Sequence, residues 1–128
     1  MILDSSAIVA IHLKEPGHDA IREKIRAAET VGIGAPTLLE TAIVLTSRLG
    51  RDARPLLRLF LRTRDFEVIP FGASHVDAAL AAFLKFGRGR HKAGLNFGDC
   101  QAYATASVAN MPLLYVGNDF SQTDIESA

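Results

Sequence analysis

Short apolar runs alternate with longer segments of helical periodicity along this chain, and that alternation constrains its fold more than any other feature. The first run, Met1 to Leu3, ends at Asp4 and precedes a segment with apolar residues at helical spacing. Proline, glycine and asparagine separate many of the later segments. The pattern predicts strands at 1–3, 31–35, 66–71 and 113–116, and helices at 5–13, 19–28, 36–49, 74–87 and 97–109, with one more beginning near Pro55.

Several helix boundaries are marked by residues with a known local preference. Pro36 suits a first helical turn, because its missing N–H would be unpaired there, and Gly50 suits a helix end. Ser74 and Asn96 are predicted N-caps, since their side-chain oxygens can accept from free backbone N–H groups. The glycine-rich, basic segment 87–96 between the last two helices is predicted to be a surface loop.

Strands that alternate with helices predict βαβ units, and therefore an α/β fold with a parallel sheet covered by helices on both faces. A chain of 128 residues is the usual size of one domain, so we expect a single domain over 1–128. Ligands in such folds bind beyond the carboxyl ends of the strands. Asp4 and Asp119 each lie at or just beyond the end of a predicted strand, which places them at that edge.

Three acids are each the only charged residue in a long stretch of sequence. Asp4 is alone in residues 1–11, Glu40 in 30–47 and Asp99 in 93–118. Burying an unpaired carboxylate costs several kcal/mol, so each acid needs donors, a proton or a cation. Clustered carboxylates repel one another unless a hard divalent cation lies among them, and Mg²⁺ and Mn²⁺ favour oxygen ligands. The acids therefore predict a metal site.

Each acid taken alone also has a simpler structural interpretation. Asp4 can cap the helix that follows it, and Asp99 can complement the dipole of the helix that Asn96 begins. Asp119 lies in a Gly-Asn-Asp turn, where aspartate is common. Glu40, amid apolar helical residues, has no local role of this kind. A purely structural role for all four acids together is less probable than such a role for any one of them.

Composition excludes several other functions. The single cysteine, Cys100, cannot form an internal disulfide, which fits a reducing cytoplasm. Nothing at the start of the chain resembles a secretory signal, and polar residues interrupt the weakly charged segment 93–118, so no membrane span is expected. The four histidines share no ligand spacing, and the serines lack a nucleophile elbow. Fourteen basic residues balance fourteen acidic ones, so any polyanion must bind at local patches.

Four motifs in this order resemble the PIN-domain family, in particular the VapC-type toxins. They are the opening Asp-Ser-Ser-Ala, Ala-Pro-Thr-Leu-Leu-Glu at 35–40, Leu-Asn-Phe-Gly-Asp-Cys at 95–100, and Leu-Leu-x-x-Gly-Asn-Asp-Phe at 113–120. The resemblance covers nearly the whole chain. It implies a three-layer α/β/α fold with a central parallel sheet of four to five strands, RNA cleavage that depends on Mg²⁺ or Mn²⁺, and inhibition by a cognate antitoxin.

The resemblance also assigns roles to residues. Asp4, Glu40, Asp99 and Asp119 take the metal-binding and catalytic acidic positions, and Ser6 supplies a supporting hydroxyl. Many members of the family carry a threonine and a further acid before the last aspartate, where this chain has Tyr115 and Gly117. A second ion would then be held weakly, and Asp124 is a candidate to compensate.

Two basic patches are candidates for contacts with RNA phosphates, with solvated surface as the alternative for both. The first is Arg88, Arg90, His91 and Lys92, and the second is Arg51, Arg54, Arg58 and Arg62.

We also expect a homodimer and an antitoxin that brings a basic side chain to the acids. Two other functions stay open at this stage: a PIN-like domain that only binds a partner, and a different Mg²⁺-dependent phosphohydrolase. The second usually needs an Asp-x-Asp after the first strand, which Asp4-Ser5-Ser6 lacks.

Overall fold

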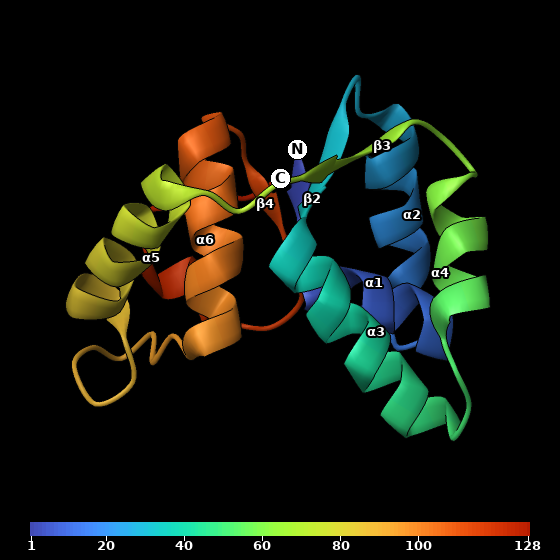
Figure 1. The fold of residues 1–128 in the computed structure, drawn as a ribbon, viewed down its shortest axis with the longest axis horizontal. Coiled ribbons are helices and arrows are strands. Elements are labelled where there is room, and N and C mark those ends of the chain that lie inside the picture. Colours follow the sequence, from blue (N-terminus) through green and yellow to red (C-terminus); the bar gives the residue numbers. More distant parts are fainter.

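The computed structural model describes all residues, 1–128, as an α/β domain with a four-stranded sheet (Figure 1). The sheet order is β3-β2-β1-β4, and each neighbouring pair is parallel. The strands are β1 (Ile2–Leu3), β2 (Val31–Gly34), β3 (Phe66–Ile69) and β4 (Leu113–Leu114). The helices are α1 (Ser5–Leu13), α2 (His18–Ala27), α3 (Ala35–Leu49), α4 (Arg54–Leu61), α5 (Ala73–Phe86), α6 (Phe97–Ala109) and the short 3₁₀ helix η1 (Phe120–Gln122).

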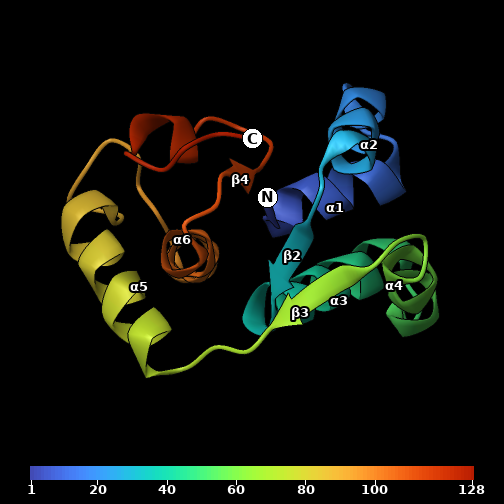
Figure 2. The ribbon, with the colours of Figure 1, turned by 90° about the horizontal axis from the view of Figure 1, so that it is seen from above.

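Helices cover the sheet on both sides, as the alternation of strands and helices predicts. Figure 2 shows α5 and α6 on one side and α1 to α4 on the other. Neighbouring residues of β1 point to opposite faces, so Leu3 packs with helices α1 to α4 while Ile2 packs with α5 and α6. Leu114 and Leu113 of β4 divide between the two cores in the same way. The predicted three layers are confirmed, with four strands.

Most predicted element boundaries are confirmed within one or two residues. Pro36 lies in the first turn of α3, and Gly50 ends that helix with a φ of 65°, a conformation that glycine adopts without steric cost. Asn96 caps α6 as predicted, because its side-chain oxygen accepts from the backbone N–H of Asp99. None of the helices combines the length and hydropathy needed to cross a bilayer.

One cap prediction is wrong, and strands β3 and β4 each end two residues before the predicted bound. Ser74 does not cap α5, because the helix begins at Ala73 with Gly72 at the N-cap position. The backbone N–H of Gly72 donates to Nδ1 of His75 over 3.1 Å, so a histidine side chain supplies the local hydrogen bond. Strand β4 ends at Leu114 rather than at residue 116, because the backbone N–H of Val116 donates to the Ser6 hydroxyl over 2.9 Å instead of to a strand.

The basic loop between α5 and α6 is anchored at its base. The backbone N–H of Arg88 donates to the Leu95 carbonyl, and the N–H of Leu95 donates to the Phe86 carbonyl. Ala93 and Leu95 are buried, whereas Arg88 and Arg90 are exposed. The predicted surface loop is therefore confirmed for its charged residues, while its apolar residues belong to the core beneath α5 and α6.

Candidate active site

The four predicted acids come from four separate parts of the fold. Asp4 directly follows β1 and caps α1, and Glu40 lies in the second turn of α3. Asp99 is the third residue of α6, and Asp119 directly precedes η1 beyond the end of β4. The parallel sheet brings these segments together, because the carboxyl ends of β1, β2 and β4 lie at one edge.

Asp4 is the most deeply buried of the acids, with 4% of its surface exposed. Its Oδ2 accepts from the Ser6 backbone N–H over 3.0 Å and from the Ser6 hydroxyl over 2.5 Å. Burial raises the pKa of Asp4; the hydrogen bonds from Ser6 and Ser5 oppose this rise, and the charge of Asp119 adds to it. The predicted helix cap is therefore real, and it coexists with the electrostatic contact to Asp119.

Glu40 reaches from α3 to the first turn of α6. A Cβ atom at Gly98 would lie 2.6 Å from its Oε1 and 2.8 Å from its Oε2, so glycine makes room for this carboxylate. Burial raises the pKa of Glu40, followed by the charge of Asp4; the Ser5 side chain lowers it, and Asp99 raises it further. Gly98 and Ser5 thus contribute to the site, although no charge pattern in the sequence marks them.

Asp99 forms a reciprocal capping box with Asn96. Its Oδ2 accepts from the Asn96 backbone N–H, and the Asn96 side-chain oxygen accepts from the Asp99 backbone N–H, both over 2.9 Å. Burial raises the pKa of Asp99 to about 6, against the effect of the Asn96 hydrogen bond. The charges of Asp4 and Asp119 raise it further, and Arg88 lowers it. The capping bond engages only Oδ2 of the carboxylate.

Asp119 is the exposed member of the group and follows a turn in which Gly117 has a φ of 104°. It acts through its charge on Asp4 and Asp99. None of the chain's ion pairs includes any of the four acids. The structure therefore gathers four carboxylates without a paired basic side chain, and their charges add to the effect of burial on the pKa values of Asp4, Glu40 and Asp99.

These carboxylates suit a hard divalent cation in their chemistry, but they do not already form its coordination shell. No three histidine, cysteine, aspartate or glutamate side chains converge closely enough to hold a metal ion. Asp4 bonds to Ser6 and Asp99 to Asn96 through local capping hydrogen bonds. A bound Mg²⁺ or Mn²⁺ would offset the repulsion among oxygen donors of the type these ions prefer. By the chemistry of their oxygen donors, the residues fit such an ion.

Ser6 links Asp4 to the segment beyond β4. Its hydroxyl donates to the Asp4 carboxylate and accepts from the backbone N–H of Val116, 110 positions away in sequence. The hydroxyl thus fixes Asp4 relative to the turn that leads to Asp119. This geometry is consistent with the supporting role that the family resemblance implies.

Asp124 does not compensate for the missing acid near Gly117. Its Oδ2 accepts from Lys85 Nζ and its Oδ1 accepts from the Tyr103 hydroxyl, each at a distance of 2.5 Å. Both of its oxygens are therefore engaged by side chains of α5 and α6. Asp124 thus links α5 and α6, which lie in the same layer. No pattern in the sequence predicts this contact.

The two basic patches differ in their relation to the acids. Arg88 is close enough to lower the pKa of Asp99, and Arg90 stacks 5.3 Å from the centroid of the Phe83 ring. His91 has a structural role, because its Nδ1 accepts from the Ala93 backbone N–H over 3.1 Å and its ring packs edge-on against Phe86. Lys92 of the same loop is exposed.

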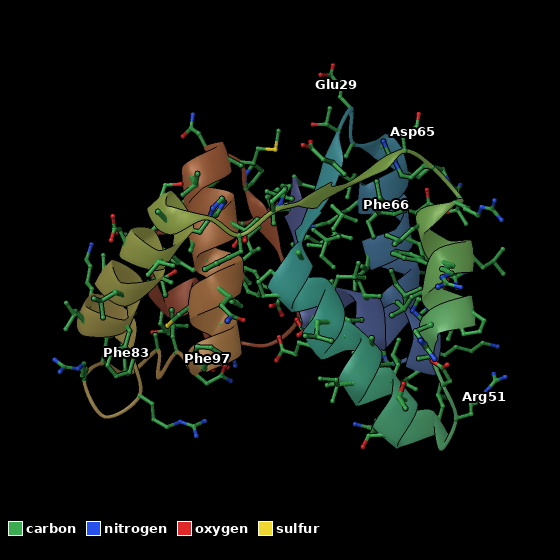
Figure 3. All side chains as sticks on the ribbon, viewed as in Figure 1. Glu29, Arg51, Asp65, Phe66, Phe83 and Phe97 are labelled. Atoms are coloured by element: carbon green, nitrogen blue, oxygen red, sulfur yellow. The ribbon has the colours of Figure 1, made fainter.

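The structure does not bring the second patch to the acids. Its residues lie in the turn before α4, on α4 and directly after it. Figure 3 labels Arg51 on the side of the molecule away from α5 and α6. Arg54 is paired with Asp52 over 2.7 Å, which lowers the pKa of that exposed aspartate to about 2. Solvated surface therefore describes this patch better than a phosphate contact at the candidate site.

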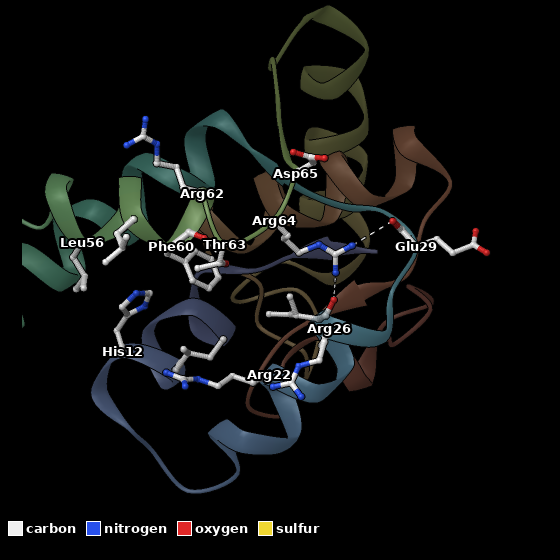
Figure 4. Close-up of a pocket in the computed structure, with 13 residues that line it drawn as sticks. His12, Arg22, Arg26, Glu29, Leu56, Phe60, Arg62, Thr63, Arg64 and Asp65 are labelled. Carbon is white, nitrogen blue, oxygen red and sulfur yellow. Dashed lines mark hydrogen bonds between the residues drawn. The ribbon is translucent and has the colours of Figure 1, made fainter.

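A pocket of about 790 Å³ lies apart from the acids, among α1, α2, α4 and the turn after α4 (Figure 4). Its lining includes His12, Arg22 and Phe60 and contains none of the four acids. Arg64 closes one side by donating to the backbone carbonyls of Ile25 and Ala28. This pocket is therefore separate from the candidate active site.

The fold and the site define an α/β protein with an acidic centre at the carboxyl edge of a parallel sheet. Comparison with known families matches residues 1–126 to the PIN domain. The chain belongs to the PIN-domain family. The match spans nearly the whole sequence, as the four motifs predicted.

Within this family, the chain is similar to VapC-type members. Ribonuclease VapC36 of Mycobacterium tuberculosis is 45% identical over 127 residues, which cover 98% of this chain and 91% of the relative. The crystal structure of Mycobacterium tuberculosis VapC20, described as a sarcin-ricin loop cleaving toxin, has a TM-score of 0.78 at 16% identity and covers 99% of this chain and 97% of its own. A toxin-antitoxin complex from Klebsiella pneumoniae matches with a TM-score of 0.71 at 17% identity, covering 96% and 92%. The two solved structures support the fold.

Proposed function

We propose that this protein is a metal-dependent endoribonuclease that acts as the toxin of a toxin-antitoxin pair. The observation that carries the proposal is the group of four carboxylates at the sheet edge, none of which has a basic ion-pair partner. Burial, with the charges of neighbouring acids, raises the pKa of Asp4, Glu40 and Asp99. Membership of the PIN-domain family and relatives named VapC ribonucleases support the nuclease activity.

Asp4, Glu40, Asp99 and Asp119 would hold Mg²⁺ or Mn²⁺. Such an ion, when bound, lowers the pKa of a coordinated water and stabilises the charge that develops on the leaving oxygen. Ser6 orients Asp4, and Gly98 allows Glu40 to approach α6. Arg88, which lies near Asp99, would position the substrate phosphate.

The attacking group in this mechanism is water, so the RNA 2′-hydroxyl need not react. We therefore expect each cut to produce a 5′-phosphate and a 3′-hydroxyl. The experiment incubates the purified protein with total bacterial RNA in Mn²⁺ buffer and maps the new 5′ ends by sequencing with and without prior phosphorylation. Asp99→Asn and excess EDTA should each reduce cleavage at the mapped positions at least 100-fold. Full activity of Asp99→Asn, or products ending in a 2′,3′-cyclic phosphate, would overturn the assignment.

A domain that binds a partner without cutting RNA is the second candidate. Gly117 stands where many family members have an acid, and no three side chains form a ready coordination shell. That function predicts no cleavage of total RNA at any Mn²⁺ concentration, together with normal partner binding by Asp99→Asn.

Two protein contacts belong to the proposed function. The Klebsiella pneumoniae neighbour is a toxin-antitoxin complex, which supports an antitoxin for this chain as well. We expect that antitoxin to place a basic side chain against the acids, so its binding should weaken as Mn²⁺ is added.

Leu39 and Ile43 on α3 are 62% and 60% exposed, and a second copy of the chain would cover them in a homodimer. Light scattering of wild type and Ile43→Asp tests the dimer.

A further inference from the structure

An apolar groove lies between α5 and α6, beside the first turn of α6. We call it the α5–α6 groove; it has a volume of about 650 Å³ and eleven lining residues, of which eight are hydrophobic. Val76, Leu80 and Phe83 line it from α5, and Phe97 and Cys100 line it from α6. Its volume is in the range of small-molecule sites. Figure 3 labels Phe83 and Phe97 near the lower ends of these two helices.

The groove and the acidic centre meet at the first turn of α6, on different faces of the helix. Phe97 and Cys100 are about one helical turn apart and line the groove, whereas Asp99 lies on another face of that turn, and Gly98 packs against Glu40. Arg88 lines the groove and also acts electrostatically on Asp99. A molecule that spans this helix turn would therefore contact the groove and the carboxylates at once.

The charges around the groove favour an anionic molecule with a flat apolar part. Arg88 lies in its lining and Arg90 stacks on Phe83, while none of the lining residues is acidic. The Phe97 side chain contributes an aromatic surface that is 82% exposed, the highest value among the chain's large hydrophobic residues. Unstacked bases of single-stranded RNA bind to such rings, with arginine contacting the adjoining phosphate.

We propose that the α5–α6 groove binds an unstacked nucleobase of the RNA substrate next to the scissile phosphodiester, with Phe97 as the stacking side chain. Arg88 contacts the phosphate between that nucleotide and the acidic centre. This inference rests on the proposed ribonuclease function and adds a determinant of substrate choice. A second copy of the chain fits the groove less well, because a twofold contact centred there would bring together two copies of Arg88 and Arg90.

The test measures RNA binding by fluorescence anisotropy in low-salt Mn²⁺ buffer, with Asp99→Asn as the background so that nothing is cut. The probes are 5′-labelled RNA octamers A8 and U8 and an octamer of abasic ribonucleotides. The background protein should bind A8 or U8 roughly 5- to 100-fold more tightly than the abasic octamer, the usual effect of one stacked base. Adding Phe97→Ala should remove that difference and leave abasic binding unchanged.

Three further variants separate stacking from other causes. Phe97→Tyr should keep the preference for bases, whereas Phe97→Leu, which retains apolar surface without a ring, should lose it. Leu59→Ala on α4 is the matched control, because Leu59 is 66% exposed and far from the groove in sequence. Arg88→Ala should weaken binding of all three octamers alike, since it removes a phosphate contact.

Several outcomes would overturn the inference. They are a base preference that survives Phe97→Ala, equal binding by Phe97→Leu and Phe97→Tyr, and no preference in the background protein. A loss of dimer mass in Phe97→Ala with an unchanged octamer profile would assign the groove to a second copy instead. The proposed function has a separate test, which is cleavage of total RNA by the wild type. If the wild type cleaves RNA but the octamer test fails, the ribonuclease function stands and the groove is not a nucleobase site.

Discussion

Asp99 combines a structural and a proposed chemical role in one side chain. Its Oδ2 accepts from the Asn96 backbone N–H in the capping box, while burial, with a further contribution from the charges of Asp4 and Asp119, raises its pKa to about 6. Asparagine at this position keeps an oxygen that can accept from Asn96 and removes the charge. Alanine removes both. The two substitutions therefore separate the capping role from the electrostatic role.

The raised pKa gives a prediction with a definite sign. A carboxyl whose folded pKa is raised costs stability once it ionises, so the protein loses stability as the pH rises from about 4 through about 6. Without metal, the free energy of unfolding of the wild type should therefore fall more between pH 5 and pH 7 than that of Asp99→Asn does. Urea unfolding of both proteins in EDTA at the two pH values measures this difference. Asp99→Ala should be about 1 kcal/mol less stable than Asp99→Asn at both pH values, the usual cost of a lost cap, because neither variant carries the charge. An equal pH dependence in wild type and Asp99→Asn would contradict the interpretation.

At the scale of elements, α3 and α6 approach each other closely at the site. Glu40 on α3 fits only because Gly98 in the first turn of α6 has no side chain. The contact joins a helix in one layer to a helix in the other. It shows that the site depends on how these two helices pack as well as on the acids themselves.

We predict that Gly98→Ala uncouples stability from activity. The new Cβ would displace the Glu40 carboxylate, a flexible group, so the fold should tolerate it and gain up to about 1 kcal/mol from helix propensity. RNA cleavage and Mn²⁺ affinity should each fall about 10-fold or more, because one ligand is moved. Gly72→Ala is the control, since nothing lies within 4 Å of its added Cβ. Unchanged Mn²⁺ affinity in Gly98→Ala would argue against Glu40 as a ligand.

At the scale of the whole molecule, the acids connect both layers and the sheet. Asp4 belongs to the strand β1 and helix α1 junction, Glu40 to α3, and Asp99 to α6. A shared cation would therefore link elements that otherwise meet mainly through two separate apolar cores. Its binding energy would add to the free energy of unfolding of the entire domain.

Mn²⁺ should accordingly raise the melting temperature of the wild type. At 100 times its Kd the ion adds about 2.7 kcal/mol, which is several degrees for a domain of this size. Differential scanning fluorimetry in low salt measures the shift. Asp4→Asn should abolish it, whereas Asp119→Asn should retain most of it, because Asp119 is exposed and on a turn. A flat response of the wild type would count against the metal site.

The pattern of residues along the chain determined much of this protein. Alternating strand and helix periods specified the layered sheet, and isolation in uncharged sequence marked Asp4, Glu40 and Asp99 before any distance was known. Local hydrogen bonds such as the Asn96 cap were also predictable, because their partners are three residues apart. Short-range geometry follows from backbone dihedral angles, which the local sequence restricts strongly.

The tertiary structure alone decided which distant groups meet. Packing of α3 against α6 places Glu40 over Gly98, and the end of β4 brings Val116 to Ser6. The same packing commits Asp124 to Lys85 and Tyr103 and opens the α5–α6 groove beside the acids. Such contacts depend on the relative positions of whole layers, which are set by the fit of many side chains at once. No periodicity or spacing within a segment encodes them.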